Sequence, residues 1–262
     1  MSYMGVIGGA VGVQILRSLN STGESTLLPD GVPPAYLNRS KLEVLLGSHV
    51  WDDVRDKTVV DFGCGEGYEV VELVHHGARR VIGVEPWPKW IASAKERIAA
   101  EDVSDTCEIV ERWDESRPKV DAIISIDSFE HYEDPAEILE LMVRMLNPGG
   151  FVLVAFGPPW YHPYGGHLFS VFPWAHLVFT EPALIRWRAR FRKDGATRFR
   201  EVEGGLNQMT IRRFERLVAE SPLEFEAFEA VPIRRLRPIA SLLPRELCTS
   251  FVRSRLRRRH RA

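Results

Sequence analysis

The sequence predicts an α/β protein built on a doubly wound, mostly parallel sheet with helices on both faces. Strand-like and helix-like segments alternate from residue 58 to residue 156, which is the pattern of a parallel sheet covered by helices. The run VDAIISID, residues 120–127, is almost continuously apolar, as expected for a strand buried on both faces. The glycine-rich turn DFGCGEG, residues 61–67, separates the first strand from the first helix.

Each expected element of this region has a local signal. The β-branched run TVVDF ends in the glycine-rich turn, and YEVVELVHHG has helical spacing and stops at Gly77. PAEILELMVRML carries proline in its first turn, and NPGG then forces a turn before the apolar run FVLVAFG. The expected strands are residues 58–62, 80–86, 107–113, 120–127 and 151–157, and the expected helices are residues 68–77, 90–102 and 135–146.

Composition describes an ordinary folded chain whose two halves differ in charge. Apolar residues make up 45% of the 262 residues, and the formal net charge is -2. From residue 151 onward there are 20 Lys and Arg against 10 Asp and Glu, a net of +10, whereas residues 1–150 carry 14 against 26, a net of -12. Cys64, Cys107 and Cys248 are too widely spaced for a metal knuckle and are odd in number, so we expect a reducing, cytoplasmic location.

The glycine-rich turn is the first candidate for a ligand site. Gly63, Gly65 and Gly67 would let a ligand approach the backbone closely and would expose N–H groups at the start of a helix. A tight turn without a ligand gives the same letters. Glu85 ends the next strand 22 residues after Gly63, near the spacing of about 20 at which an acidic side chain reaches a ribose diol. The two features together predict a nucleoside-type cofactor.

Four motifs in the expected order resemble those of the class I S-adenosylmethionine-dependent methyltransferases. They are DFGCGEG, VIGVEP, WDES and LNPGG. The order G-C-G-E-G departs from the G-x-G-x-x-G fingerprint of dinucleotide-binding proteins. The resemblance is dense over residues 56–156 and thin over residues 204–235. It implies a Rossmann-like sheet of seven strands, with S-adenosyl-L-methionine as the cofactor.

The resemblance also implies roles for individual residues. The glycine-rich turn would pass beneath the methionine part of the cofactor, with Asp61 near its amino group, and Glu85 would accept both ribose hydroxyls. Asp114 would lie near the adenine N6 and the Trp113 backbone on the ring edge. Asp61 and Asp114 could instead be helix caps or turn formers, and Trp113 could be a core residue. The expected cofactor-binding residues are Asp61, Gly63, Cys64, Gly65, Gly67, Glu85, Pro86, Trp113, Asp114 and Asp127.

The segment DSFEHYEDP, residues 127–135, resembles the E-x-x-E-H segment of the ubiquinone-biosynthesis O-methyltransferases, with Asp127 in place of the first glutamate. Three interpretations stay open. Asp127, Glu130 and His131 could hold a divalent cation such as Mg²⁺ or Mn²⁺. His131 could be the catalytic general base for a hydroxyl. Glu130 could also cap the next turn while His131 packs under the cofactor.

The stretch GPPWYHPYGGH, residues 157–167, carries three prolines and three glycines, which neither a helix nor a central strand accepts. GPPW is similar to the base-clamping motif of nucleic-acid adenine methyltransferases, but it follows the fifth strand rather than the fourth and lacks the first polar side chain. We therefore expect a loop that opens a substrate-cap insertion over residues 157–205. His167 in this loop is the second candidate for the catalytic base.

The sequence predicts that the rest of the chain forms the end of the core, followed by a basic tail. FVRSRLRRRHRA ends the sequence with six arginines, which suits an anionic membrane surface, nucleic acid or a disordered solubilising end. The apolar run before Arg17 is too short to span a bilayer, so a flexible segment or a helix folding over the domain is expected. The predicted division is 1–50 N-terminal segment, 51–156 cofactor-binding core, 157–205 cap insertion, 206–235 end of the sheet and 236–262 basic tail.

The sequence therefore predicts an S-adenosylmethionine-dependent methyltransferase that methylates a small-molecule hydroxyl, such as that of a saccharide, glycolipid or quinone-like lipid. Peripheral membrane contact through the C-terminal arginines is one option for this cytoplasmic protein. Two alternatives stay open. One is an RNA methyltransferase that uses the basic tail, although no RNA-binding module or base-clamping motif is present. The other is a non-catalytic scaffold that only binds the cofactor.

Overall fold

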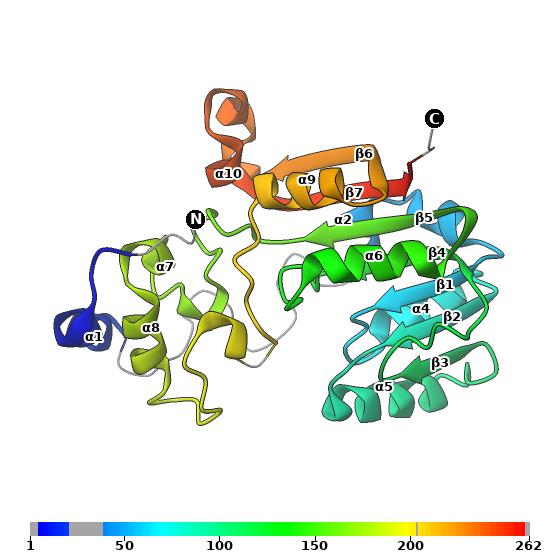
Figure 1. Cartoon of the computed structure of the whole chain (residues 1–262), viewed down its shortest axis with the longest axis horizontal. Coiled ribbons are helices and arrows are strands. Elements are labelled where there is room, and N and C mark those ends of the chain that lie inside the picture. The colour runs from blue at the N-terminus through cyan, green and yellow to red at the C-terminus, as the bar shows by residue number, and fades with distance from the viewer. Residues whose placement is uncertain (1–4, 21–38, 203, 260–262) are drawn as a thin grey trace.

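The computed structural model describes residues 5–20, 39–202 and 204–259, and its centre is one seven-stranded sheet (Figure 1). The strand order is β3-β2-β1-β4-β5-β7-β6. Strands β1 to β5 pair in parallel, whereas β7 is antiparallel to both of its neighbours. The predicted doubly wound, mostly parallel fold is confirmed. The strands are β1 Thr58–Phe62, β2 Arg80–Val84, β3 Cys107–Val110, β4 Val120–Ile126, β5 Leu146–Phe156, β6 Leu223–Pro232 and β7 Thr249–Arg258.

Helices cover both faces of the sheet, because successive strand side chains point to opposite sides. In β1, Val59 belongs to the apolar cluster under α2 to α5, and Val60 belongs to the cluster under α6 and α9. The expected turn at NPGG is present as a bulge inside β5, where Leu146 pairs with Val120 and Phe151 with Ala122. These helices are α2 Lys41–Leu46, α3 Val50–Val54, α4 Tyr68–His75, α5 Pro88–Ala100, α6 Pro135–Met145 and α9 Ile211–Glu220.

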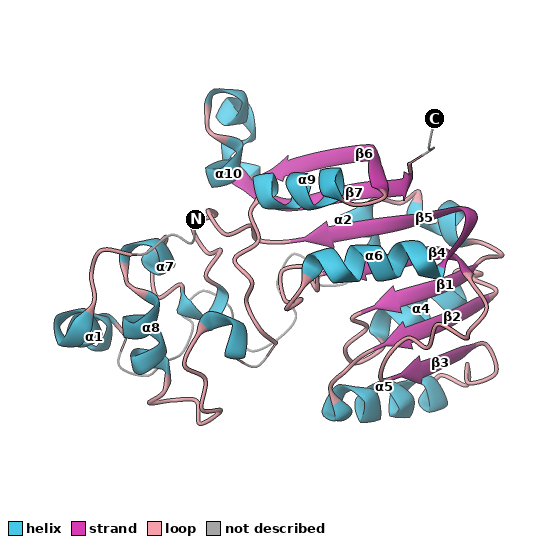
Figure 2. Cartoon of the chain, in the orientation of Figure 1, coloured by secondary structure: helices cyan, strands magenta, loops and turns pink. Residues whose placement is uncertain are grey.

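The segment after β5 forms a mostly helical body beside the sheet, together with the N-terminal helix (Figure 2). Leu16 of the N-terminal helix is fully buried in this body, and the Trp187 indole donates a 3.0 Å hydrogen bond to the Asn20 carbonyl. Ile7 pairs with Phe179 as an isolated bridge. The elements are α1 Gly9–Leu19, η2 His167–Phe169, α7 Ala175–Val178, α8 Glu181–Arg188 and η3 Phe199–Glu201. The N-terminal helix therefore packs on the predicted cap insertion.

The C-terminal arginines are not a tail, and this part of the sequence-based prediction is wrong. Residues Thr249–Arg258 form β7, which lies inside the sheet between β5 and β6. Alternate arginines of β7 share one face with alternate glutamates of β6, so they form cross-strand ion pairs. The pairs are Arg253–Glu229, Arg255–Glu226 and Arg257–Glu224, at 2.5, 2.6 and 2.9 Å.

Arg258, which ends β7, and Arg259, which follows it, donate hydrogen bonds to backbone carbonyls. Arg258 bonds the carbonyls of Val143 and Leu146 near the end of α6, and Arg259 bonds the Ala219 carbonyl of α9 at 2.8 Å. The expected contact of the C-terminal arginines with a membrane or with nucleic acid is therefore not supported, because each described arginine of this segment already bonds a glutamate or a backbone carbonyl of the sheet and its helices. Residues 260–262 lie outside the described part of the chain.

The remaining connection between β6 and β7 consists of η4 Arg234–Leu242 and α10 Arg245–Cys248, which project from the sheet (Figure 1). Within the described residues, no helix combines the length and apolar character needed to cross a bilayer.

We predict that Arg255 is the arginine of β7 on which stability depends most. Its guanidinium pairs with Glu226 and with Asp53 of α3 at 2.8 Å, and lies 3.7 Å from the Phe151 ring centroid. Arg255→Ala should lower the free energy of unfolding by about 2 kcal/mol, because it removes a cation–π contact and leaves two carboxylates without a cation. Urea denaturation followed by circular dichroism measures this difference.

Arg257→Ala is the matched control, because Arg257 has one carboxylate partner and a half-exposed side chain. Its loss should cost less than about 1 kcal/mol. Equal costs at the two positions would show that the pairing with Asp53 and Phe151 contributes nothing.

Candidate functional site

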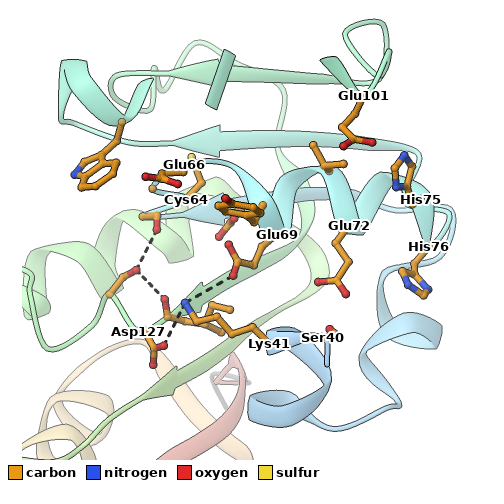
Figure 3. Close-up of a pocket in the computed structure, with 18 of the residues that line it drawn as sticks. Ser40, Lys41, Cys64, Glu66, Glu69, Glu72, His75, His76, Glu101 and Asp127 are labelled. Carbon is orange, nitrogen blue, oxygen red and sulfur yellow. Dashed lines mark hydrogen bonds and ion pairs between the residues drawn. The ribbon is translucent and has the colours of Figure 1, made fainter. Parts of the chain in front are cut away.

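A cleft of about 880 Å³ lies beside the carboxyl ends of β1 and β4 (Figure 3). Parallel strands end at one edge of a sheet, so the loops that follow them come together there, and this is where doubly wound folds bind ligands. The cleft is walled by the turn entering α2, the glycine-rich turn, α4, the loop after β4, and both ends of α5. The residues lining it include Lys41, Asp61, Gly63, Cys64, Gly65, Glu69, Glu72, Asp127 and Ser128.

The glycine-rich turn needs glycine for two different reasons. Gly63 has φ +88°, and a Cβ there would lie 2.5 Å from the Ser128 Oγ, so the backbone passes directly against the loop after β4. Gly65 has φ +50° with no atom within 4 Å of the Cβ position, so its surface is open to a ligand. Gly67 caps α4 and packs against Ala94 of α5. The turn therefore presents bare backbone to the cleft.

Glu85 binds the glycine-rich turn to the end of β2. One carboxylate oxygen accepts the Gly65 N–H at 2.9 Å and the other accepts the Trp87 N–H at 3.0 Å. Glu85 is only 5% exposed, and burial raises the pKa of its carboxyl group, although the two N–H bonds oppose the rise. Each oxygen accepts one bond in this geometry and keeps a lone pair for a second donor.

Asp61 is a buried carboxyl group with an unused acceptor. It is 2% exposed, it lines the cleft, and its Oδ2 has no hydrogen-bond partner among the described residues. Its pKa is raised well above the ordinary value, first by burial and then by the nearby charge of Glu69. A cation entering the cleft would reverse this shift by pairing with the carboxylate.

Lys41 was not identified from the sequence. Its Nζ lies 3.2 Å from the Asp127 Oδ2 and 3.7 Å from the Glu69 Oε1, so it bridges two walls of the cleft (Figure 3). The sequence does contain a signal for the start of α2, because the Ser40 hydroxyl caps the Glu43 N–H at 3.1 Å. That signal is local, and it does not indicate which distant carboxylates the next residue reaches.

The predicted adenine contacts have other partners in this structure. Trp113 is 9% exposed and belongs to the apolar cluster under α6 and α9. Asp114 accepts the Ser116 N–H at 2.9 Å, as a turn former does, and this bond holds the pKa of Asp114 below its ordinary value. These are the alternative interpretations that the sequence left open, and the adenine roles stay predictions.

Five of the ten predicted cofactor residues line the cleft: Asp61, Gly63, Cys64, Gly65 and Asp127. The other five do not line it, and these are Gly67, Glu85, Pro86, Trp113 and Asp114. Glu85 is nevertheless joined to the cleft through its bond to Gly65.

The metal site considered for Asp127, Glu130 and His131 is not formed. Among the described residues, no group of three or more His, Cys, Asp or Glu side chains could hold a metal ion. The three side chains have separate partners: Asp127 pairs with Lys41, Glu130 accepts the Gly157 N–H at 3.2 Å, and His131 bonds the Gly205 carbonyl at 2.8 Å. Burial and the charge of Asp127 raise the pKa of Glu130 to about 8.

The structure does bring the two predicted catalytic histidines together. The rings of His131 and His167 meet edge to face, with centroids 5.3 Å apart. A carbonyl only accepts, so the His131 Nδ1 must donate to the Gly205 carbonyl, which leaves Nε2 without a proton in the neutral ring. Burial lowers the pKa of His131, and it lowers the pKa of His167 to about 3. Neither ring lines the 880 Å³ cleft.

The return of the insertion to the sheet holds the loop that carries His131. The Asn207 side-chain amide donates to the carbonyls of Phe129 and Tyr132, both at 2.9 Å, and the Asn207 N–H donates to the Glu130 carbonyl. The position of His131 therefore depends on residues that follow the insertion. The sequence offered no signal for this, because the contacts join distant segments.

Comparisons with known proteins show what part of this chain resembles methyltransferases. Residues 60–154 match a family described as Methyltransferase domain. The chain is 31% identical over 104 residues to the ubiquinone biosynthesis O-methyltransferase of Neisseria meningitidis serogroup C, which covers 38% of this chain and 44% of that protein. It is 29% identical over 111 residues to the tRNA U34 carboxymethyltransferase of Cellvibrio japonicus, covering 38% and 34%. The chain thus spans less than half the length of these curated relatives.

Similarity to solved structures extends over more of the chain. The crystal structure of an S-adenosylmethionine dependent methyltransferase from Mesorhizobium loti aligns with a TM-score of 0.52 at 19% identity. The alignment covers 79% of this chain and 93% of that one. At this identity, the likeness establishes a shared fold.

We predict that Asp61 lowers the free energy of unfolding of the ligand-free protein. Its folded-state pKa is raised, so the fold loses stability as the pH rises above the ordinary aspartate pKa, because the unfolded chain then gives up the proton that the folded carboxyl group keeps. Asp61→Asn should therefore raise the free energy of unfolding at neutral pH by about 1 kcal/mol or more, since one pKa unit corresponds to about 1.36 kcal/mol. The gain should vanish as the pH falls below about 4. Urea denaturation at several pH values measures it.

Asp114→Asn is the control of opposite sign, because the pKa of Asp114 is lowered. This substitution should lower stability above pH 4 rather than raise it. A loss of stability in Asp61→Asn at neutral pH would contradict the interpretation of the buried carboxyl group.

Proposed function

We propose that this chain carries a class I S-adenosylmethionine-dependent methyltransferase domain and that it methylates a hydroxyl group of a small molecule. The observation that carries the proposal is the Glu85-bound glycine turn beside the buried carboxyl of Asp61, at the edge of the 880 Å³ cleft. It combines an acidic hydrogen-bond acceptor, open backbone and an unused carboxylate oxygen within one small region.

These residues fit S-adenosyl-L-methionine. The unpartnered Oδ2 of Asp61 suits the ammonium group of a methionine moiety, which would ionise the carboxyl. The remaining lone pairs of Glu85 suit two ribose hydroxyls, and the open surface of Gly65 would let the ligand lie against the backbone. When bound, the cofactor supplies a methyl group on a positively charged sulfur.

His131 is the proposed general base. Its Nε2 is the unprotonated nitrogen of the neutral ring, because Nδ1 donates to Gly205. In the proposed reaction Nε2 would take the proton of the acceptor hydroxyl, whose oxygen could then accept the methyl group that the bound cofactor would supply. His167, whose ring contacts that of His131, would help to position it. The metal-assisted route is set aside, because the carboxylates beside His131 bind other partners.

The proposed acceptor is a saccharide, a glycolipid or a quinone-like lipid. The similarity to a ubiquinone biosynthesis O-methyltransferase supports a hydroxyl acceptor. The insertion also has an exposed aromatic side chain, Trp174 (39% exposed), which suits an acceptor with apolar surface. The similarity to a tRNA-modifying enzyme keeps RNA as the competing acceptor, without the C-terminal arginines as its binding site.

We predict that Glu85→Ala weakens S-adenosylmethionine binding by about 1.5 to 3 kcal/mol, the usual range for losing a charged hydrogen-bond acceptor. Isothermal titration calorimetry on the folded variant measures the change. Glu96→Ala, an exposed glutamate on α5, is the control and should bind like the wild type. Wild-type affinity in Glu85→Ala would remove the ribose contact from the proposal.

We predict that methyl-labelled cofactor transfers its label to a small-molecule or lipid fraction of a cell extract, and that His131→Ala lowers this transfer by about 100-fold or more. Cofactor affinity should stay unchanged in the variant. Because burial lowers the pKa of His131, the acid limb of kcat/KM should lie below pH 6.5, the ordinary histidine value. Below that limb the base is protonated and the rate falls.

If the label is found only in RNA, the acceptor is RNA and the proposal of a small-molecule acceptor is wrong. An absence of label in every fraction, with normal cofactor binding, would favour the scaffold alternative. Full activity in His131→Ala would end the role of His131 as the base.

A further inference from the structure

The connection between β6 and β7 projects from the sheet (Figure 1) and carries exposed aliphatic side chains. No residue of η4 is buried. Four aliphatic side chains within nine residues are exposed: Ile239 by 46%, Leu242 by 82%, Leu243 by 38% and Leu247 by 39%. Single exposed aliphatic residues are common on proteins, but a group of four on one protruding segment indicates a binding surface.

The same projection is basic. Residues 233–248 contain four arginines and one glutamate. Arg234, Arg235 and Arg237 are exposed, and none of them forms an ion pair with a described side chain. The fourth, Arg245, pairs with Glu215 at 2.5 Å, and the single glutamate, Glu246, accepts two backbone N–H groups at the start of α9. The uncompensated charge of the projection is therefore positive.

A second cleft, of about 660 Å³, lies at the base of the projection. Arg212, Arg213 and Arg216 of α9 line it together with Leu247, and Glu246 is the one acidic residue among its described lining. None of the three arginines has an ion-pair partner among the described residues, whereas the Glu246 carboxylate is engaged by the N–H groups of Ile211 and Arg212. No lining residue is shared with the 880 Å³ cleft, so this is a separate site.

We propose that this surface, the η4–α10 projection with its arginine-lined cleft, docks on an anionic lipid bilayer. The aliphatic side chains would enter the boundary between headgroups and acyl chains, the exposed arginines would lie among the headgroups, and the cleft would take a headgroup phosphate. Leu247 belongs to both the apolar group and the cleft, so one docked orientation satisfies both.

The combination of apolar and basic groups on this surface favours an anionic bilayer over the other kinds of partner. A nucleic acid or a soluble phosphate would use the arginines but would gain nothing from four exposed aliphatic side chains. An apolar protein partner would cover the aliphatic residues but would leave the arginines uncompensated. An anionic bilayer offers negative charge at its surface and hydrocarbon immediately below it.

The test is sedimentation of the full chain with vesicles of phosphatidylcholine, alone or mixed with phosphatidylglycerol. We expect binding to the anionic vesicles, weak binding to the neutral ones and a loss of binding as salt screens the arginines. Leu242→Ser and the double variant Arg212→Gln/Arg216→Gln should each weaken binding about tenfold or more. Neither variant changes a buried apolar residue, and thermal unfolding checks that both remain folded.

Matched controls lie away from the projection. Trp87→Ser replaces a large apolar side chain that is 50% exposed before α5, and Arg190→Gln/Arg192→Gln removes the same charge from the segment after α8. Both should bind anionic vesicles like the wild type. These measurements need no methyl transfer, so they stand or fall independently of the proposed reaction.

Several outcomes would overturn the proposal. They are absence of binding to anionic vesicles, equal binding to neutral ones and equal losses in the control variants. Release from the vesicles by inorganic phosphate alone would assign the cleft to a soluble phosphate. Binding of RNA without binding of vesicles would assign the basic surface to nucleic acid.

Discussion

The carboxylate of Glu85 is the constraint on which the cofactor side of the site depends. It joins the end of β2 to the glycine-rich turn by accepting the Gly65 N–H, and it is buried without an ion pair to any described side chain. A buried carboxylate is stable only when its hydrogen-bonding capacity is used. Two backbone N–H groups use half of that capacity in the protein alone, and a ligand with two hydroxyls would use the rest. The same bond keeps Gly65 open toward the cleft.

The acceptor side depends on contacts between segments far apart in the chain. Asn207 and Gly205 follow the insertion and bind the loop after β4, so the insertion helps to position the loop that carries His131. This coupling would let a change in the insertion shift His131, the proposed base, without contacting it. Asp127 lies in the same loop, but its side chain forms an ion pair with Lys41 across the cleft.

Two groups of arginines in the C-terminal half differ: one stabilises the sheet, and the other has no ion-pair partners among the described residues. The arginines of β7 have cross-strand glutamates or backbone carbonyls as partners, so they stabilise the sheet. Those of η4 and α9 face solvent without ion-pair partners among the described residues. The net charge of +10 from residue 151 onward is the sum of both kinds, and a count of charges cannot separate them. Only the unpaired group is available to a ligand.

The sequence by itself determined the sheet from β1 to β5, the glycine turn and the place of Glu85, because strand alternation, helical spacing and glycine-rich turns are local patterns. Tertiary structure alone decided which charges meet. Lys41 reaches Asp127, Glu130 turns to Gly157 while His131 turns to Gly205, and Arg255 finds Asp53. Each pairing joins segments that the fold brings together, and a local pattern carries no information about a distant partner. The run of arginines therefore had the composition of a solvent-exposed tail, although strand pairing with the glutamates of β6 made it part of the sheet.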